Sequence, residues 1–188
     1  FSTAGKAVRF QEDQVRAMGR TARGVRGIRM KEGHSVVSLM IPQLDGMVLT
    51  ASENGYGKRT QLEEFPAYSR GSQGVIAMQC SDRNGNLVAA TQVFEGDEMM
   101  LISDKGTLVR SSTEEVSCLS RNTQGVRLIR LSQEDERLVG VQRIADTGLA
   151  EDEVVGDDES LVVDAPDVSG EVSGPESTGD TSEEGDEG

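Results

Sequence analysis

Aromatic residues, histidine and cysteine are scarce in this sequence. Its 188 residues include no Trp, two Tyr, four Phe, one His and two Cys. Two cysteines make neither a disulfide framework nor a zinc-ligand set, which needs closely spaced pairs. No apolar run approaches the roughly 18 residues that span a bilayer, and no charged-then-apolar signal segment opens the chain. We therefore expect a soluble, cytoplasmic protein.

Side-chain patterns that carry catalysis are missing as well. His34 has no Ser, Cys or metal-ligand partner at a recognisable spacing, which is typical of a solvated surface turn. Residues 55–60 depart from a phosphate-binding loop, because Ser52 stands where Gly is required and Arg59 where Ser or Thr is required. No carboxylates form a pair suited to acid-base catalysis outside the acidic C-terminal segment. We expect no catalytic residue, metal site or cofactor site in this chain.

Charge is distributed unevenly along the chain. All 19 Lys and Arg lie within residues 6–143, whereas 15 of the 33 acidic residues lie within residues 151–188. Residues 1–150 thus hold 19 basic and 18 acidic residues, and the net charge of −14 belongs to the C-terminal segment. Residues 149–188 are rich in Gly, Ser, Asp and Glu and bury too little apolar area to offset chain entropy. The sequence predicts a disordered acidic tail there.

An internal repeat of about 50 residues organises the chain before the tail. A glycine followed four positions later by arginine occurs at Gly5, Gly55 and Gly106. A second landmark, Arg-x-x-x-Gly-Val, keeps the same register and begins at Arg20, Arg70 and Arg121. Two landmarks in phase predict three tandem units within residues 1–148, at about 1–46, 47–98 and 99–148.

Each unit is expected to contain about four short antiparallel strands and few helices. An apolar strand meets a glycine turn and returns as a hairpin, because glycine supplies the positive φ of such turns. A strand with alternating faces follows, and a last strand is predicted at residues 36–41, 87–93 and 138–144. This pattern is the signature of propeller-type blades. Cys80 and Cys118 align with small or apolar repeat positions, so we interpret both as structural thiols.

Basic side chains recur at the turns of the units. On a propeller they would form a belt around the rim and follow the curved phosphate backbone of duplex DNA. Single strands are usually held by stacking on aromatic residues, which are scarce here. The densest group lies in residues 1–30, where seven basic residues face two acidic ones. The candidate DNA-binding residues are Lys6, Arg9, Arg16, Arg20, Arg23, Arg26, Lys58, Arg59, Arg70, Arg110, Arg121 and Arg127.

A second interpretation of the repeated arginines is structural. Arg20, Arg70 and Arg121 hold one repeat position and would fasten strands by pairing with repeated acids. Those acids are Glu12, Glu63 and Glu114. Both interpretations stay open at the repeat positions. The arginines within residues 16–29 outnumber the acids near them, which favours the DNA-binding interpretation for that group.

Four stretches of the chain closely resemble the last blades of the C-terminal domain of the gyrase A family. They are residues 17–29, 53–60, 104–110 and 120–126. The resemblance covers about residues 1–145 and implies an all-β β-pinwheel, a six-bladed ring of which three blades are half, whose rim wraps duplex DNA. It also implies that gyrase B and a second copy of gyrase A are partners. Their A2B2 enzyme introduces negative supercoils at the nucleoid, using ATP and Mg²⁺ held outside this segment.

The sequence also departs from the gyrase pattern. The basic Gln-Arg-Arg-Gly-Gly-Lys-Gly box of the first blade is absent, and Phe1 opens the chain in mid-pattern, so we read it as a piece of a longer polypeptide. The family's catalytic tyrosine belongs to another domain, so neither Tyr56 nor Tyr68 receives that role. A half ring is expected to expose unpaired strand edges, and the tail is expected to compete with DNA for the basic rim.

Two other assignments remain alternatives. The C-terminal domain of the topoisomerase IV counterpart of gyrase A has related blades and supports decatenation, but residues 24–29 and the acidic tail favour gyrase. A protein-binding propeller of the kelch kind has a similar repeat length. Its double-Gly and aromatic signatures are missing here.

Overall fold

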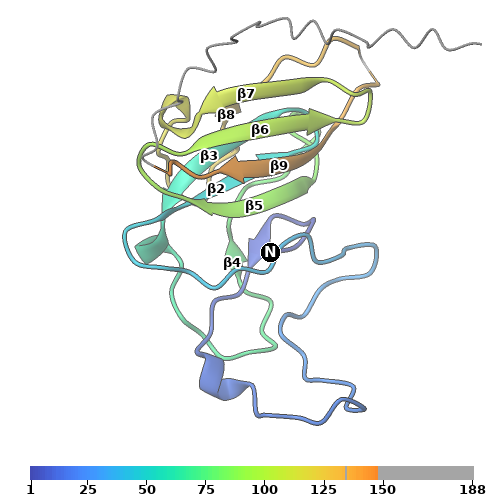
Figure 1. The fold of residues 1–188 in the computed structure, drawn as a ribbon. Coiled ribbons are helices and arrows are strands. Elements are labelled where there is room, and N and C mark those ends of the chain that lie inside the picture. The colour runs from blue at the N-terminus through green and yellow to red at the C-terminus, as the bar shows by residue number, and fades with distance from the viewer. Residues whose placement is uncertain (134, 148–188) are drawn as a thin grey trace, which may run out of the picture. The chain divides into compact units, whose positions relative to one another are not determined.

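The regular structure of the protein is antiparallel β-sheet. The computed structural model describes residues 1–133 and 135–147, so the predicted disorder of residues 149–188 lies outside the described residues. Within the described residues there is no α-helix, and short 3-10 turns lie at η1 (Glu12–Gln14), η2 (Leu62–Glu64) and η3 (Thr113–Glu115). The strands are β1 (Lys6–Ala7), β2 (Met47–Ser52), β3 (Tyr56–Gln61), β4 (Val75–Ile76), β5 (Leu87–Val93), β6 (Glu98–Ser103), β7 (Leu108–Ser112), β8 (Val126–Arg127) and β9 (Leu138–Ile144). The all-β prediction is confirmed (Figure 1).

The repeat inferred from the sequence reappears in the backbone. The hairpin glycines Gly5, Gly55 and Gly106 have φ values of 67°, 78° and 87°, the left-handed region that glycine adopts without steric cost. The three 3-10 turns begin at residues 12, 62 and 113 and so keep the repeat spacing. The glycine turns predicted from the repeat are therefore present.

The sheets do not follow the boundaries of the sequence units. One sheet has the order β5-β2-β3-β8, a second the order β7-β6-β9, and a third pairs β1 with β4. Strand β4, from the second unit, thus pairs with the hairpin of the first unit. Strand β8, from the third unit, pairs with the hairpin of the second unit. The sequence predicted four strands per unit but not this exchange, which joins neighbouring units by backbone hydrogen bonds.

The main hydrophobic core lies between the sheets of the second and third units. It contains Leu49 and Val93 from one sheet and Met99, Leu101 and Leu138 from the other. Strands β5 and β9 lie side by side, as Figure 1 shows, and they join the two sheets into one packed body. Burial of these side chains stabilises the fold and fixes how successive units are oriented.

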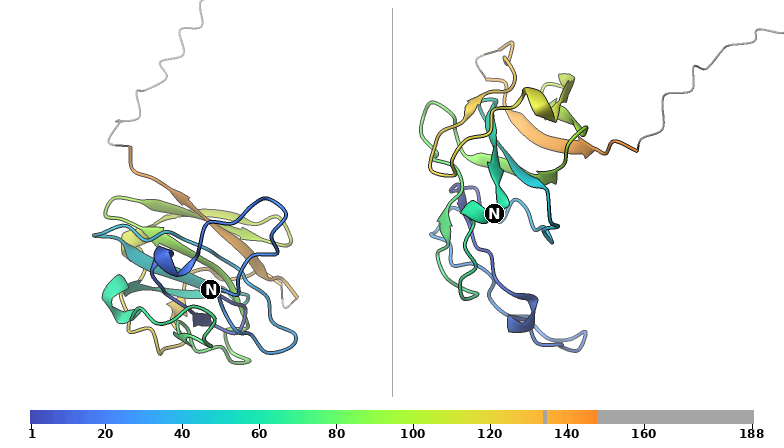
Figure 2. Two further views of the ribbon diagram at one scale, coloured as in Figure 1. Left: turned by 90° about the horizontal axis from the view of Figure 1, so that it is seen from below. Right: turned by 90° about the vertical axis from the view of Figure 1, so that its left-hand side faces the viewer.

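The first unit is less complete than the other two. The strand predicted at residues 36–41 is wrong, since only Val36 forms a bridge, with Ser2, and Leu39 and Ile41 are 90% and 88% exposed. Its counterparts β5 and β9 pair along their lengths with β2 and β6, whereas this segment bonds the first residues of the chain through its backbone and the Ala90 amide through Ser38 Oγ. Figure 1 and Figure 2 show the blue segment around η1 extending away from the sheets of the second and third units.

The two cysteines lie in different surroundings. Cys80 is half-buried beside Gly5, in agreement with a structural thiol, and burial raises the pKa of its thiol. Cys118 is exposed, so its predicted core position is wrong. It follows η3 in a loop whose repeat-equivalent residues also face solvent.

Candidate nucleic-acid interface

Lys58 is a structural residue, and the prediction that it contacts DNA is wrong. Its side chain is fully buried, and its Nζ donates to the carbonyl oxygens of Ser120, Arg121 and Thr123 and to Thr123 Oγ1. Burial lowers the pKa of Lys58 to about 8. Because all its donors point inward, Lys58 holds the loop at residues 120–123 instead of reaching solvent.

The repeated landmark arginines fasten each unit to the one before it. Arg70 donates from Nε to the Gln14 carbonyl over 3.1 Å and from Nη1 to the Arg26 carbonyl over 2.7 Å. Arg121 makes the same two bonds one repeat later, to the Glu64 carbonyl over 3.0 Å and the Ile76 carbonyl over 2.9 Å. The structural interpretation therefore describes Arg70 and Arg121, with backbone carbonyls as acceptors in place of the predicted acids.

The hairpin arginines reach in the opposite direction. Arg9 donates to the carbonyls of Leu62 and Phe65, and Arg59 donates to the carbonyls of Glu114 and Val116. Each of the two junctions between units is thus held by one arginine from either side and by an exchanged strand. We call these contacts the first junction, between the first and second units, and the second junction, between the second and third.

The arginines of the first unit are left facing solvent. The side chains of Arg16, Arg20, Arg23 and Arg26 are exposed, and within residues 1–133 and 135–147 no acceptor binds their guanidinium groups. Lys6, on β1, is half-buried. An arginine without a local partner keeps its charge and donors available to phosphate oxygens. These residues form the most open basic surface that the structure describes.

The remaining predicted residues are engaged by side chains. Arg110 forms an ion pair with Glu98 at the edge of the β7-β6-β9 sheet. Arg127 donates from Nη2 to the hydroxyl of Tyr56 over 2.9 Å, and its guanidinium lies 5.4 Å from the centre of the Tyr56 ring. Hydrogen bonding by Arg127, and then by Arg83, lowers the pKa of Tyr56.

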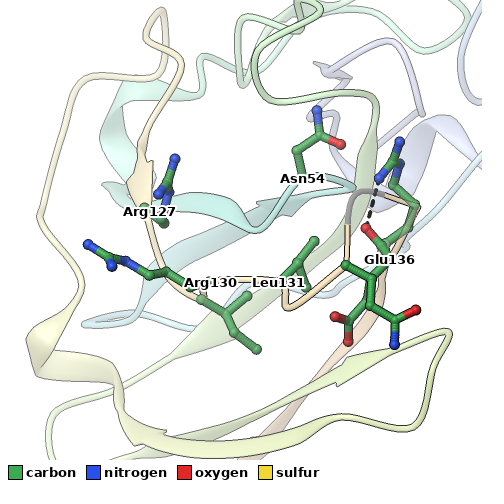
Figure 3. Close-up of a pocket in the computed structure, with 8 residues that line it drawn as sticks. Asn54, Arg127, Arg130, Leu131 and Glu136 are labelled. Carbon is green, nitrogen blue, oxygen red and sulfur yellow. Dashed lines mark hydrogen bonds between the residues drawn. The ribbon is translucent and has the colours of Figure 1, made fainter.

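Sequence reasoning missed two basic residues near Tyr56. Arg83 is exposed, and its guanidinium lies 4.8 Å from the centre of the Tyr56 ring. Arg130 is exposed and lines a cavity of about 340 Å³ together with Arg127. Figure 3 shows Arg127 and Arg130 on one side of the cavity and Glu136 on the other. Arg83 has no basic residue at its repeat-equivalent positions, so the repeat gave no signal for it, whereas Arg130 is equivalent to Arg29 and could have been found from the repeat.

Comparison with known proteins agrees with this geometry. A family model described as "DNA gyrase C-terminal domain, beta-propeller" matches residues 1–43, 46–93 and 97–145. The chain belongs to the DNA gyrase C-terminal domain family. The three matched ranges follow the three units of the sequence repeat.

The relatives of this chain in the DNA gyrase C-terminal domain family are much longer than the chain itself. The DNA gyrase A protein of Pseudomonas aeruginosa is 56% identical over 153 residues, which are 81% of this chain and 16% of the relative. A solved DNA gyrase A C-terminal domain matches with a TM-score of 0.70 and 30% identity, over 77% of this chain and 49% of that structure. The C-terminal domain of DNA topoisomerase IV matches with the same TM-score at 24% identity, over 76% and 45%, which shows a shared fold.

Metal sites and membrane spans are missing from the part of the chain that the structure describes. Within it, no group of three or more His, Cys, Asp or Glu is placed to hold a metal ion. No helix there is long and apolar enough to cross a membrane.

Proposed function

We propose that this chain binds duplex DNA through the exposed arginines of its first unit and the arginines around Tyr56. The observation that carries the proposal is the set Arg16, Arg20, Arg23 and Arg26, which face solvent without an acidic partner among the described residues. Contacts of this kind neutralise phosphates and release counterions, so they bind DNA with little dependence on sequence.

In the complete gyrase A protein, the same surface would be one part of a rim that wraps DNA. The parent enzyme would be an ATP-dependent type IIA topoisomerase, an A2B2 assembly with gyrase B that works on the nucleoid in the cytoplasm. ATP and Mg²⁺ would be used by its other domains. This chain would supply wrapping and no catalytic group.

The acidic tail would limit this binding. Residues 151–188 carry 15 acidic side chains and no basic one, so they can compete with phosphates for the arginines. Removing them should tighten DNA binding, most strongly at low salt, where charge interactions are least screened.

The test measures affinity for a duplex as a function of salt, for residues 1–188, residues 1–150 and a variant with Arg16, Arg20, Arg23 and Arg26 changed to Gln. We expect a steep salt slope, a shallower slope for the variant and tighter binding without the tail. A variant with Glu12 and Asp13 changed to Gln and Asn is the control for the same surface. Salt-insensitive binding to a protein with no DNA affinity would instead favour a protein-binding propeller.

A further inference from the structure

Each junction inside the chain contains one pair of residues at the same place in the fold. At the first junction Lys6 pairs with Ile76, and at the second Tyr56 pairs with Arg127. In both pairs the residue after the hairpin glycine faces the residue after the landmark valine, so the two pairs hold equivalent repeat positions. Residues paired directly across antiparallel strands point to one face, with their Cβ atoms about 5 Å apart.

Each pair carries one positive charge, but the charge comes from opposite strands. At the first junction the hairpin supplies the cation, Lys6, and the exchanged strand β4 supplies the apolar Ile76. At the second junction the exchanged strand β8 supplies the cation, Arg127, and the hairpin supplies Tyr56. Like charges directly opposite each other destabilise a sheet, which accounts for a limit of one cation in a pair. Packing alone would be satisfied by two apolar residues and requires no cation.

Basic residues next to the two pairs are held by backbone carbonyls. They are Arg9 and Arg70 at the first junction and Lys58, Arg59 and Arg121 at the second. The ammonium group of Lys6 differs from them, since it has no hydrogen-bond partner within residues 1–133 and 135–147. A lysine stem packs along apolar surface while its charge stays in water, so Lys6 can lie along Ile76 and present its ammonium group to a ligand.

The cation of the second junction is held in place by Tyr56. The Tyr56 hydroxyl accepts a 2.9 Å hydrogen bond from Arg127 Nη2, and the ring is packed in a buried cluster with Met78 and Leu87. Arg127 itself is exposed. A guanidinium group carries five N–H donors, so those that Tyr56 does not accept remain for a phosphate. Tyr56 is therefore a fixed support that orients an exposed cation.

We propose that each junction binds one phosphodiester of duplex DNA, through Lys6 at the first junction and through Arg127, positioned by Tyr56, at the second. This inference rests on the proposed function and deepens it, because it adds Lys6 to the binding residues and fixes where a cation must lie. The place of the charge at the junction determines binding, and the strand that supplies the charge does not. The two sites bind separate phosphates, because they lie one unit apart.

The first test converts the pair of the first junction into the pair of the second. Lys6→Tyr removes the charge and should weaken duplex binding by the 188-residue chain about five- to tenfold near 0.1 M salt, with a salt slope smaller by about 0.9. Adding Ile76→Arg returns a cation to the same place from the other strand. Affinity and slope should then recover, and circular dichroism checks that each variant is folded.

A matched control returns the charge to a different place. Leu44 is 84% exposed and precedes β2, whose other end meets the hairpin turn at Gly55. Lys6→Tyr combined with Leu44→Arg has the net charge of the wild type but no cation at the pair. This variant should bind as weakly as Lys6→Tyr alone, because phosphate contact depends on position as well as on total charge.

The second test examines the Arg127 site. Arg127→Ile should reduce the salt slope by about 0.9, and by about 1.8 when combined with Lys6→Tyr, because two phosphates are then released. Arg127→Lys keeps the charge and should retain the slope. Tyr56→Phe keeps the ring and every charge but removes the hydroxyl, so it should weaken binding about threefold with little change in slope. A purely structural role of Tyr56 would leave the affinity of the folded Tyr56→Phe chain unchanged.

Three results would overturn the proposal. They are a Lys6→Tyr variant that binds as the wild type does, an added Ile76→Arg that restores nothing, and an added Leu44→Arg that restores as much as Ile76→Arg. A wild-type chain that binds no duplex would remove the proposed function and this inference together. If the wild type binds DNA through Arg16, Arg20, Arg23 and Arg26 but Lys6→Tyr has no effect, only this inference fails.

Discussion

The carboxylate of Glu136 accepts a 2.6 Å hydrogen bond from the hydroxyl of Thr107, across the hairpin end of the third unit. Ser103 Oγ donates to the same oxygen, also at 2.6 Å, and the Ser132 amide donates to the other oxygen. Glu136 is 1% exposed, so these donors replace water as its partners. Hydrogen bonds from Ser103, then Thr107 and Ser132, lower the pKa of Glu136 to about 2.

This carboxylate makes the stability of the fold depend on pH. Because the pKa of Glu136 is about 2 in the folded chain and near 4.5 when unfolded, its contribution is complete above pH 4.5 and is lost as pH falls toward 2. We expect the unfolding free energy of the wild type to fall more steeply over this window than that of Glu136→Gln. Urea titrations at several pH values measure it, and parallel curves for the two proteins would contradict the assignment.

Removing the buried amino group of Lys58 should cost stability without changing DNA binding. Lys58→Met keeps a similar volume but leaves buried carbonyls without a donor, which we expect to cost about 2 kcal/mol. Denaturant unfolding gives the loss, and Lys31→Met, at an exposed position, is the control. An unchanged stability together with a smaller salt slope for DNA would show that Lys58 reaches phosphate after all.

The three landmark glycines should respond differently to alanine. Gly24, Gly74 and Gly125 all have positive φ. Only Gly74, at the first junction, and Gly125, at the second, face a carbonyl of the preceding unit. Gly74→Ala and Gly125→Ala should lose about 3 kcal/mol or more. Gly24→Ala should lose only the backbone cost of about 1 kcal/mol. Thermal unfolding of dilute samples compares them, and equal losses would mean that the junctions do not require glycine.

Two arginines should separate stability from DNA affinity. Arg121→Gln removes two bonds to carbonyls and should cost about 2 kcal/mol with little effect on the salt slope. Arg23→Gln should leave stability within about 0.5 kcal/mol and reduce the salt slope by about 0.9 if Arg23 contacts one phosphate. Unfolding and binding are measured on both variants. If Arg121→Gln instead reduced the salt slope and Arg23→Gln instead lost stability, the roles assigned to these two arginines would be wrong.

The repeat in the sequence predicted the glycine turns and the four strands of the second and third units, because both are local, but it overpredicted strands in the first unit, where the structure has only β1. It could not predict that β4 and β8 leave their own units, since the pairing of Val126 with Gly57 depends on packing between distant residues. Nor could it separate Lys58, which is buried, from Arg23, which is exposed, because both are basic residues near turns. The scarcity of acids near residues 16–29 was the signal that did identify the open surface.

Strand exchange has a consequence for the way the chain matures on the ribosome. The β2-β3 hairpin ends at Gln61, but its outer partner, β8, is made only when residues 126 and 127 emerge. Synthesis delivers residues from the N-terminus onward, so each unit waits with an open edge until its successor appears. The units are therefore completed in the order in which they are made. The third unit is made last, and no later part of the described chain covers its edge at β7.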